Sequence, residues 1–329
     1  MELTYEQWKQ ARKEIKRRMS ISGWTVLIYD WIVSICVIGV MAAEVISKLA
    51  KGMILGNTVS IEKALLQSSQ SAWGYILAMA IGLIILLLWK KTRFFRKEIL
   101  AKGAPMKTGS FFVILCVFIS GQMLFQILTT GLELGLNCFG YTITNGLESL
   151  QTSPDNFGMF LYAGILGPIT EEILFRGVVQ RSMLPFGKKL AILVSSLTFG
   201  LFHVNLIQMP YAFAVGLILG YVAAEYNIVW SMVLHVINNL VLGDLLYRLF
   251  GWLPMETANL IVWGIIMAFS VVAVILVIIK RADIKAWLQR EHIIGAYAGC
   301  YFTCAGTIAM LIVMGISTVI TTRSMITPL

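Results

Sequence analysis

Apolar runs of about 20 residues recur along most of the chain, and they limit its fold more than any other feature, because a helix of that length crosses the hydrocarbon core of a bilayer. The chain is 58% hydrophobic and only 13% charged, whereas soluble domains are about 25% charged. Candidate spans lie at residues 22–47, 72–89, 110–134, 157–182, 190–207, 210–225, 228–247, 257–279 and 294–320. The sequence therefore predicts an all-α polytopic membrane protein with eight to nine transmembrane helices.

The chain divides into three parts by the content of these spans. Residues 1–150 hold a basic N-terminal segment and three spans, residues 157–246 hold four spans with two of the three histidines, and residues 257–329 hold the C-terminal spans. The first apolar run is too long for a secretory signal, which predicts an uncleaved anchor. Five scattered cysteines without a C-x-x-C pair indicate buried thiols rather than a disulfide framework or a zinc knuckle.

The basic residues predict how the chain lies in the membrane. Cytoplasmic connections of membrane proteins are enriched in Lys and Arg. If the N-terminus is cytoplasmic, the inside segments hold 21 of the 26 Lys and Arg residues. We therefore expect a multi-pass protein of the cell membrane with its N-terminus in the cytoplasm and its C-terminus outside. The net charge of +9 lies in clusters between apolar runs, which favours the lipid bilayer as a partner and argues against nucleic acid.

Two adjacent glutamates and an arginine form the first polar motif, in the sequence GPITEEILFRG. On a helix, Glu172 and Arg176 share a face, so an ion pair between them is expected. Glu171 is turned by about 100° from Glu172 and is free to point elsewhere. A desolvated, unpaired carboxylate is a candidate base for activating water. The alternative is a structural network without chemistry, but ionisable groups inside a span are usually functional.

Two histidines supply the second and third polar motifs, F-x-x-x-H at His203 and H-x-x-x-N at His235. Asn239 shares a helix face with His235, and Asn238 is also close to it. A histidine and an amide together can donate hydrogen bonds to a developing oxyanion. Glu171 with His203 can hold and deprotonate a water. Straight spans would put the two histidines about 21 Å and about 10 Å from the cytoplasmic end, so tilted or staggered helices are expected.

Other membrane hydrolases leave different marks on a sequence. The H-E-x-x-H motif of zincins and the G-x-S-x-G motif of serine hydrolases are absent. An intramembrane aspartyl protease pairs YD with GxGD. Tyr29 and Asp30 supply the first pair, but the segment 241–244 reads VLGD and lacks the leading glycine.

The three motifs, in this order on three separate spans, resemble the CPBP family of CAAX-prenyl-protease and bacteriocin-processing membrane peptidases, also called the Abi family. The resemblance covers residues 157–246 and includes every motif position, whereas residues 1–150 contribute only membrane spans. It implies an intramembrane endopeptidase that hydrolyses a peptide bond of a membrane-associated peptide or protein. It also implies that the helices surround a polar catalytic cavity.

The resemblance implies six catalytic residues, which are Glu171, Glu172, Arg176, His203, His235 and Asn239. Glu171 would activate water together with His203, while His235 and Asn239 would stabilise the oxyanion. The family has been described both as metal-dependent and as a glutamate-type peptidase without an obligatory metal. The sequence requires no cofactor, and we favour metal-free chemistry. If a divalent metal such as zinc is present, Glu171, His203 and His235 are the expected ligands, with a fourth position open.

Two other functions are compatible with the sequence. The chain could be a non-catalytic membrane regulator or an immunity protein that keeps the peptidase fold for binding. It could also be a transporter that uses the glutamates as a proton relay. The identity of the substrate and the oligomeric state stay open at this point.

Overall fold

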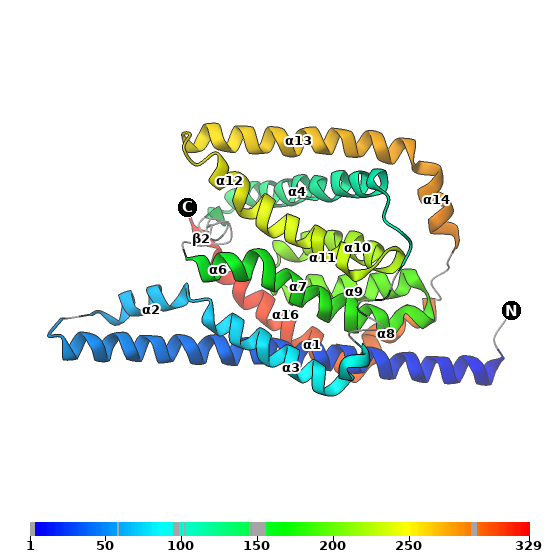
Figure 1. Ribbon diagram of the computed structural model, residues 1–329, viewed down its shortest axis with the longest axis horizontal. Helices are drawn as coiled ribbons and strands as arrows, with labels where there is room; N and C mark the ends of the chain where they lie inside the picture. Colours follow the sequence, from blue (N-terminus) through cyan, green and yellow to red (C-terminus); the bar gives the residue numbers. More distant parts are fainter. Residues whose placement is uncertain are drawn as a thin grey trace.

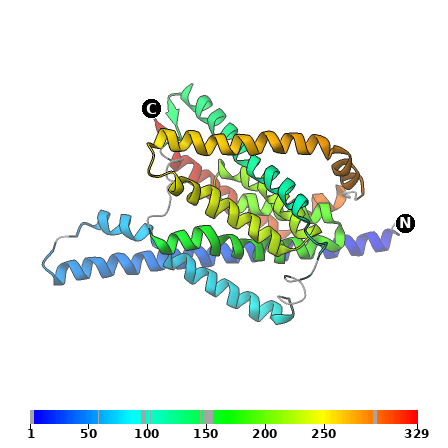
Figure 2. The same ribbon diagram turned by 45° about the horizontal axis from the view of Figure 1, so that its top comes forward.

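A computed structural model of the chain describes residues 4–57, 59–94, 99, 101, 103–144, 146, 156–290 and 295–329. The described chain is almost entirely helical, and most of its long helices run roughly along the length of a single bundle (Figure 1). The N-terminal end of the first helix and the C-terminus lie at opposite ends of this bundle (Figures 1 and 2). The expectation of an all-α, multi-pass membrane protein is confirmed.

Seven helical stretches in the described part of the chain are long and apolar enough to cross a membrane. Five of them consist of α1 (Tyr5–Ile54), α3 (Trp73–Phe94), α4 (Thr108–Asn137), α13 (Met255–Ile279) and α16 (Ala305–Met325). The other two are the composite stretches Phe157–Phe186 and Ile228–Leu249. Two further expected spans form α9 (Lys188–Phe202) and α10 (Gln208–Glu225), which pack closely against each other. The count of eight to nine stays a prediction that depends on these two helices.

Two expected span boundaries are wrong for local backbone reasons. The helix expected at 190–207 ends at Phe202, because His203 caps it and Val204 then adopts a left-handed backbone with φ of 42°. At 15 residues, α9 is about 22 Å long. The last span begins at Ala305 rather than at residue 294, since the short helices α15 (Gly295–Ala298) and η6 (Gly299–Thr303) precede it.

The stretch that carries the first polar motif is an irregular helix. It passes through α6 (Phe157–Leu161), the π-helix η2 (Tyr162–Leu166), α7 (Gly167–Glu172), the π-helix η3 (Ile173–Gln180), α8 (Arg181–Met183) and the 3₁₀ turn η4 (Leu184–Phe186). Pro168 lies at the start of α7, directly after the π-helix η2. The helix continues through this region, with wider turns on both sides of Glu171 and Glu172. Such π turns are frequent at functional sites.

The stretch that carries the third motif is irregular in the same way. It consists of α11 (Ile228–Val236), the π-helix η5 (Ile237–Leu245) and α12 (Leu246–Leu249). Its π segment approaches the first stretch closely, because a Cβ on Gly164 would lie 2.9 Å from Leu240 Cδ1. The wide turns of η2 and η5 therefore face each other beside the polar motifs.

The first and last spans pack side by side and support this region. In α1 and α16, Gly23 and Gly306 bring the two backbones together, and a Cβ on Gly306 would lie only 2.0 Å from the Ser20 carbonyl oxygen. Buried apolar side chains from α1, η3, α9 and α16 form one core cluster around this contact. The N-terminal and C-terminal parts of the chain thus pack against the helices that carry the polar motifs.

Short elements occur at the two ends of the bundle. At the end where the C-terminus lies, β1 (Tyr141–Thr142) pairs antiparallel with β2 (Thr327–Pro328), and α2 (Ile61–Ser69) lies near the end of α1 (Figure 1). At the other end lie α8, α14 (Arg281–Arg290) and the basic start of α1 (Figure 1). Three of the basic clusters thus share one end of the bundle. That this end faces the cytoplasm stays a prediction.

Candidate active site

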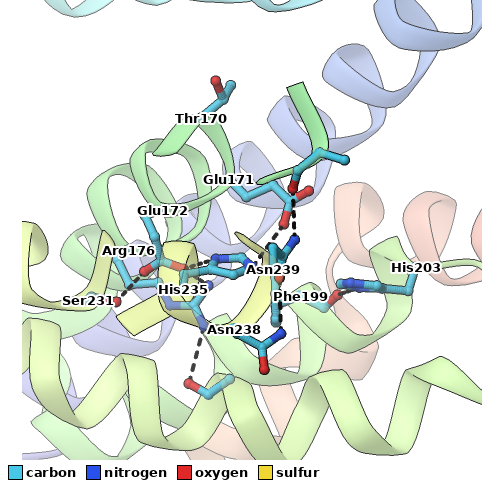
Figure 3. Close-up of polar contacts among 12 residues, drawn as sticks. Thr170, Glu171, Glu172, Arg176, Phe199, His203, Ser231, His235, Asn238 and Asn239 are labelled. Carbon is cyan, nitrogen blue, oxygen red and sulfur yellow. Dashed lines mark hydrogen bonds and ion pairs between the residues drawn. The ribbon is translucent and has the colours of Figure 1, made fainter. Parts of the chain in front are cut away.

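Glu172 is the centre of the polar cluster (Figure 3). Its side chain and that of Arg176 are both 0% exposed, and Glu172 Oε1 lies 3.1 Å from Arg176 Nη1. The ion pair expected from their spacing is therefore present. The other Glu172 oxygen, Oε2, accepts a hydrogen bond from the hydroxyl of Ser231 on α11. Buried ions need such additional partners, because their removal from water is costly.

Arg176 has contacts to two neighbouring helices. Its guanidinium lies over the Phe199 ring of α9, 4.5 Å from the centroid. Its Nη2 donates a 3.3 Å hydrogen bond to the Gly216 carbonyl of α10. A cation over an aromatic face is attracted by the ring quadrupole, so Arg176 ties the first polar motif to α9 and α10.

His235 lies between the two glutamates. Its Nδ1 is 2.9 Å from Glu172 Oε1, and its Nε2 is 3.7 Å from Glu171 Oε2. Because a carboxylate only accepts hydrogen bonds, Nδ1 carries the hydrogen of the bond to Glu172. The Nε2 atom is thereby directed at Glu171, which fixes the orientation of the ring.

Glu171 differs from Glu172 in its surroundings. Its side chain is 22% exposed, and it points away from Arg176 toward His235 (Figure 3). The helical turn between the two glutamates thus separates a fully buried, paired carboxylate from a partly accessible one. Only the partly accessible carboxylate, that of Glu171, can reach both water and a substrate.

His203 lies at the C-terminal cap of α9. Its Nδ1 is 2.9 Å from the Phe199 carbonyl oxygen, and its ring packs edge-on against the Phe199 ring at 4.8 Å. The Phe199 ring also contacts the His235 ring at 5.6 Å, so both histidines pack against the same aromatic side chain. Within the described residues, no hydrogen bond or ion pair joins His203 to Glu171. The Glu171 carboxylate instead faces His235 Nε2. The expected pair of Glu171 and His203 stays a prediction.

Asn239 is held from two sides at the edge of the cluster. Its Nδ2 donates a 3.2 Å hydrogen bond to the Ala163 carbonyl in η2. Its Oδ1 accepts a 3.0 Å hydrogen bond from Asn238 Nδ2. The amide therefore lies between the π segments of the two motif helices (Figure 3).

The sequence motifs did not include every side chain of the cluster. Ser231 precedes His235 by four residues on α11, a spacing that could have revealed it. Gln122 on α4 and Tyr211 on α10 hydrogen-bond to Asn238. They lie far from the motifs in the sequence, and only their polarity within apolar helices marks them.

The family model of type II CAAX prenyl endopeptidase Rce1-like matches residues 153–241. This segment includes all six expected site residues and also Ser231, which hydrogen-bonds to Glu172. The segment is similar to this family. A search of curated proteins and a search of solved structures returned no match. The match to a CAAX protease family model supports the resemblance given by the three motifs.

An apolar cavity of about 290 Å³ lies beside the segment that matches the family model. Residues that line it include Trp24, Ile28 and Tyr29 of α1, Leu86 and Trp89 of α3, and Leu174 of η3. Leu174 follows Glu171 by three residues, so it lies on a neighbouring face of the same helix. The cavity is thus apolar and flanks the site, and the expected polar cavity stays a prediction.

Among the described residues, no three His, Cys, Asp or Glu side chains are grouped so that they could hold a metal ion as they stand. Of the three side chains expected as zinc ligands, His235 bonds to Glu172 and His203 bonds to the Phe199 carbonyl, each through Nδ1. Such bonds from Nδ1 are compatible with metal ligation through Nε2, so the choice between metal-free and metal-dependent chemistry stays a prediction. We derive no chemical step from a metal.

Proposed function

We propose that the chain is an intramembrane endopeptidase that hydrolyses a peptide bond of a membrane-associated substrate with a water activated by Glu171. The observation that carries this proposal is the 3.7 Å separation of Glu171 Oε2 and His235 Nε2. The two side chains come from different helices and meet in a predominantly apolar interior. Glu171 is partly accessible, whereas the carboxylate that orients His235 is fully buried.

Glu171 is the base in the proposed reaction. A water can hydrogen-bond to Glu171 Oε2 at about 2.8 Å, next to His235 Nε2, which lies 3.7 Å from the same carboxylate oxygen. The carboxylate takes a proton from this water as the oxygen attacks the substrate carbonyl, and it later delivers the proton to the leaving amine. His203 would assist in holding the water through Nε2, because its Nδ1–H donates to Phe199. Removal of a general base typically slows catalysis about 10²–10⁴-fold.

His235 and Asn239 are the proposed donors to the oxyanion. His235 donates from Nε2 when both ring nitrogens carry hydrogen, because Glu172 already accepts from Nδ1. Its positive charge then balances Glu171 while Arg176 balances Glu172. The Asn239 amide has two hydrogens, and Ala163 accepts one of them. The second is available for the developing negative charge.

Glu172, Arg176 and Ser231 are proposed to position His235 rather than to react. The two glutamate oxygens hold the histidine and the serine hydroxyl, both of which lie on α11. The arginine offsets the glutamate charge. A buried network of this kind keeps a reactive imidazole in one orientation.

We propose that the substrate is a peptide that ends in a prenylated Cys-a-a-X sequence. This proposal follows from the family model that matches residues 153–241. The apolar cavity supports this proposal, because Leu174 in its wall is one helical turn from Glu171. A prenyl chain in the cavity would leave the peptide close to the base. We further propose that a hydrated polar space surrounds Glu171 and that α9 and α10 complete a set of nine spans.

The test compares wild-type chain with Glu171→Ala and His203→Ala, at equal abundance, for cleavage of a co-expressed prenylated substrate. We expect wild type to cleave it and both variants to lose cleavage while they still bind it. Equal processing by all three proteins would contradict the proposal. Net proton flux in proteoliposomes without cleavage would favour a transporter, and substrate binding without cleavage by wild type would favour a regulator.

A further inference from the structure

A hydrogen-bonded chain of side chains leads from α4 to Asn239. Gln122 Nε2 donates to Tyr211 OH at 2.7 Å and to Asn238 Oδ1 at 3.0 Å. The Tyr211 hydroxyl donates to the same Asn238 oxygen at 2.8 Å. Asn238 Nδ2 then donates to Asn239 Oδ1 at 3.0 Å. Four helical segments, α4, α10, η5 and η2, are joined by this chain and its final bond to Ala163.

We propose that Gln122 and Tyr211 are positioning residues that, through Asn238, set the direction of the Asn239 amide for oxyanion stabilisation. This inference rests on the proposed peptidase function. Gln122 lies outside the family segment 153–241, so part of the site orientation comes from the N-terminal spans.

The direction of each amide follows from its partners. An Asn side chain has an oxygen that accepts and a nitrogen that donates. The Ala163 carbonyl can only accept, so the end of Asn239 bonded to it is the nitrogen, and the Asn239 oxygen accepts from Asn238 Nδ2. The Asn238 oxygen then faces Gln122 Nε2 and Tyr211 OH, which both donate to it and hold this orientation.

This order decides which end of Asn239 meets the substrate. With its oxygen held by Asn238, the Asn239 nitrogen faces Ala163 and the space between the motif helices. A reversed amide would present an oxygen there and would repel an oxyanion. Donors fixed before the reaction stabilise a developing charge without reorganisation.

The packing around Tyr211 keeps the chain of hydrogen bonds in place. Its ring lies 5.2 Å from the Phe125 ring, centroid to centroid. A Cβ on Gly121 would be in ordinary contact with the ring, 3.6 Å from Tyr211 Cε2. Because these contacts involve the ring alone, Tyr211→Phe removes the hydroxyl and leaves them intact. The variant therefore isolates the hydrogen bonds from the packing.

The experiment measures kcat and KM of full-length protein in liposomes with a farnesylated Cys-a-a-X peptide. We expect Asn239→Ala to lower kcat on the order of 10²-fold, as for other oxyanion donors. Tyr211→Phe and Gln122→Met should each lower kcat about 10-fold with KM within about twofold, because a misdirected donor loses only part of that stabilisation. Tyr221→Phe on α10 and Gln126→Met on α4 are the matched controls. Both should keep wild-type kcat.

A double variant separates positioning from a general structural role. Tyr211→Phe added to Asn239→Ala should cause no further loss, since the hydroxyl acts through the amide that is already absent. The inference would be overturned if Tyr211→Phe lowered kcat by the same factor in wild type and in the Asn239→Ala variant. It would also be overturned if Tyr211→Phe alone did not lower kcat. Wild type that cleaves no more peptide than Glu171→Ala would overturn the peptidase proposal, and this inference with it.

Discussion

The Oε1 atom of Glu172 lies 2.9 Å from Nδ1 of His235, although 63 residues separate the two in the chain. This contact joins the first polar motif to the third in a buried setting. It also directs the other ring nitrogen of His235 at Glu171, 3.7 Å away. Glu172 thus orients His235, and His235 faces Glu171. The two adjacent glutamates therefore have different roles.

The buried ion pair under this contact should be needed for folding. Arg176→Ala leaves Glu172 as an unpaired charge at 0% exposure, and we expect a loss of roughly 3–5 kcal/mol in the free energy of unfolding. Chemical unfolding in detergent micelles measures it. Arg17→Ala is the control, because the Arg17–Glu14 pair is exposed and exposed ion pairs contribute little to stability. Similar small losses in both variants would contradict the buried role of Arg176.

The contact between the first and last spans should depend on Gly306. Gly306→Ala places a Cβ against the Ser20 carbonyl, so α1 and α16 must separate. We expect a lower thermal unfolding temperature than for wild type. Gly315→Ala on the same helix is the control, because a Cβ there meets no atom within 4 Å and alanine favours a helix by roughly 0.5–1 kcal/mol. An unchanged unfolding temperature for Gly306→Ala would mean that the helices do not approach as described.

The orientation of the chain can be tested with Cys138. It is the exposed member of the five cysteines, whereas the other four are buried, and it lies just before β1 at the end of the bundle opposite the start of α1 (Figure 1). With the N-terminus in the cytoplasm, a membrane-impermeant maleimide should label intact cells at this residue. Cys138→Ser should abolish the labelling. Labelling only in inverted vesicles would reverse the orientation.

Peptide cleavage should survive removal of divalent metals. The proposed reaction uses Glu171 and His235 without a metal, so activity in a chelator should stay within about twofold of its starting value. Cleavage rates before and after dialysis against chelator measure this. Loss of cleavage that zinc restores would instead assign Glu171, His203 and His235 as ligands.

The sequence predicted those parts of the site that depend on spacing along one helix. The ion pair of Glu172 with Arg176 and the divergence of Glu171 follow from the helical period, and both are present. Contacts between helices depend on how the helices cross, and the spacing of residues along one helix carries no information about that crossing. The 3.7 Å approach of Glu171 to His235 is such a contact, and the expected action of Glu171 with His203 stays a prediction.

The span boundaries show a second limit of sequence reasoning. Hydropathy measures composition, and the apolar run through residue 207 continues past the point where the backbone leaves the helix at His203. The π segments beside Glu171 and Asn239 also lack a composition signal. Gln122 contributes through a contact that spans 116 residues, which no local pattern could indicate.

The most direct measurement is the cleavage rate of a prenylated peptide by purified wild type and by Glu171→Gln in liposomes. The substitution keeps the size of the side chain and leaves the buried Glu172–Arg176 ion pair in place, so folding and KM should be unchanged. We predict that kcat falls about 10²–10⁴-fold, as expected when a general base is removed. A Glu171→Gln variant that cleaves at the wild-type rate would contradict the claim that this glutamate activates water.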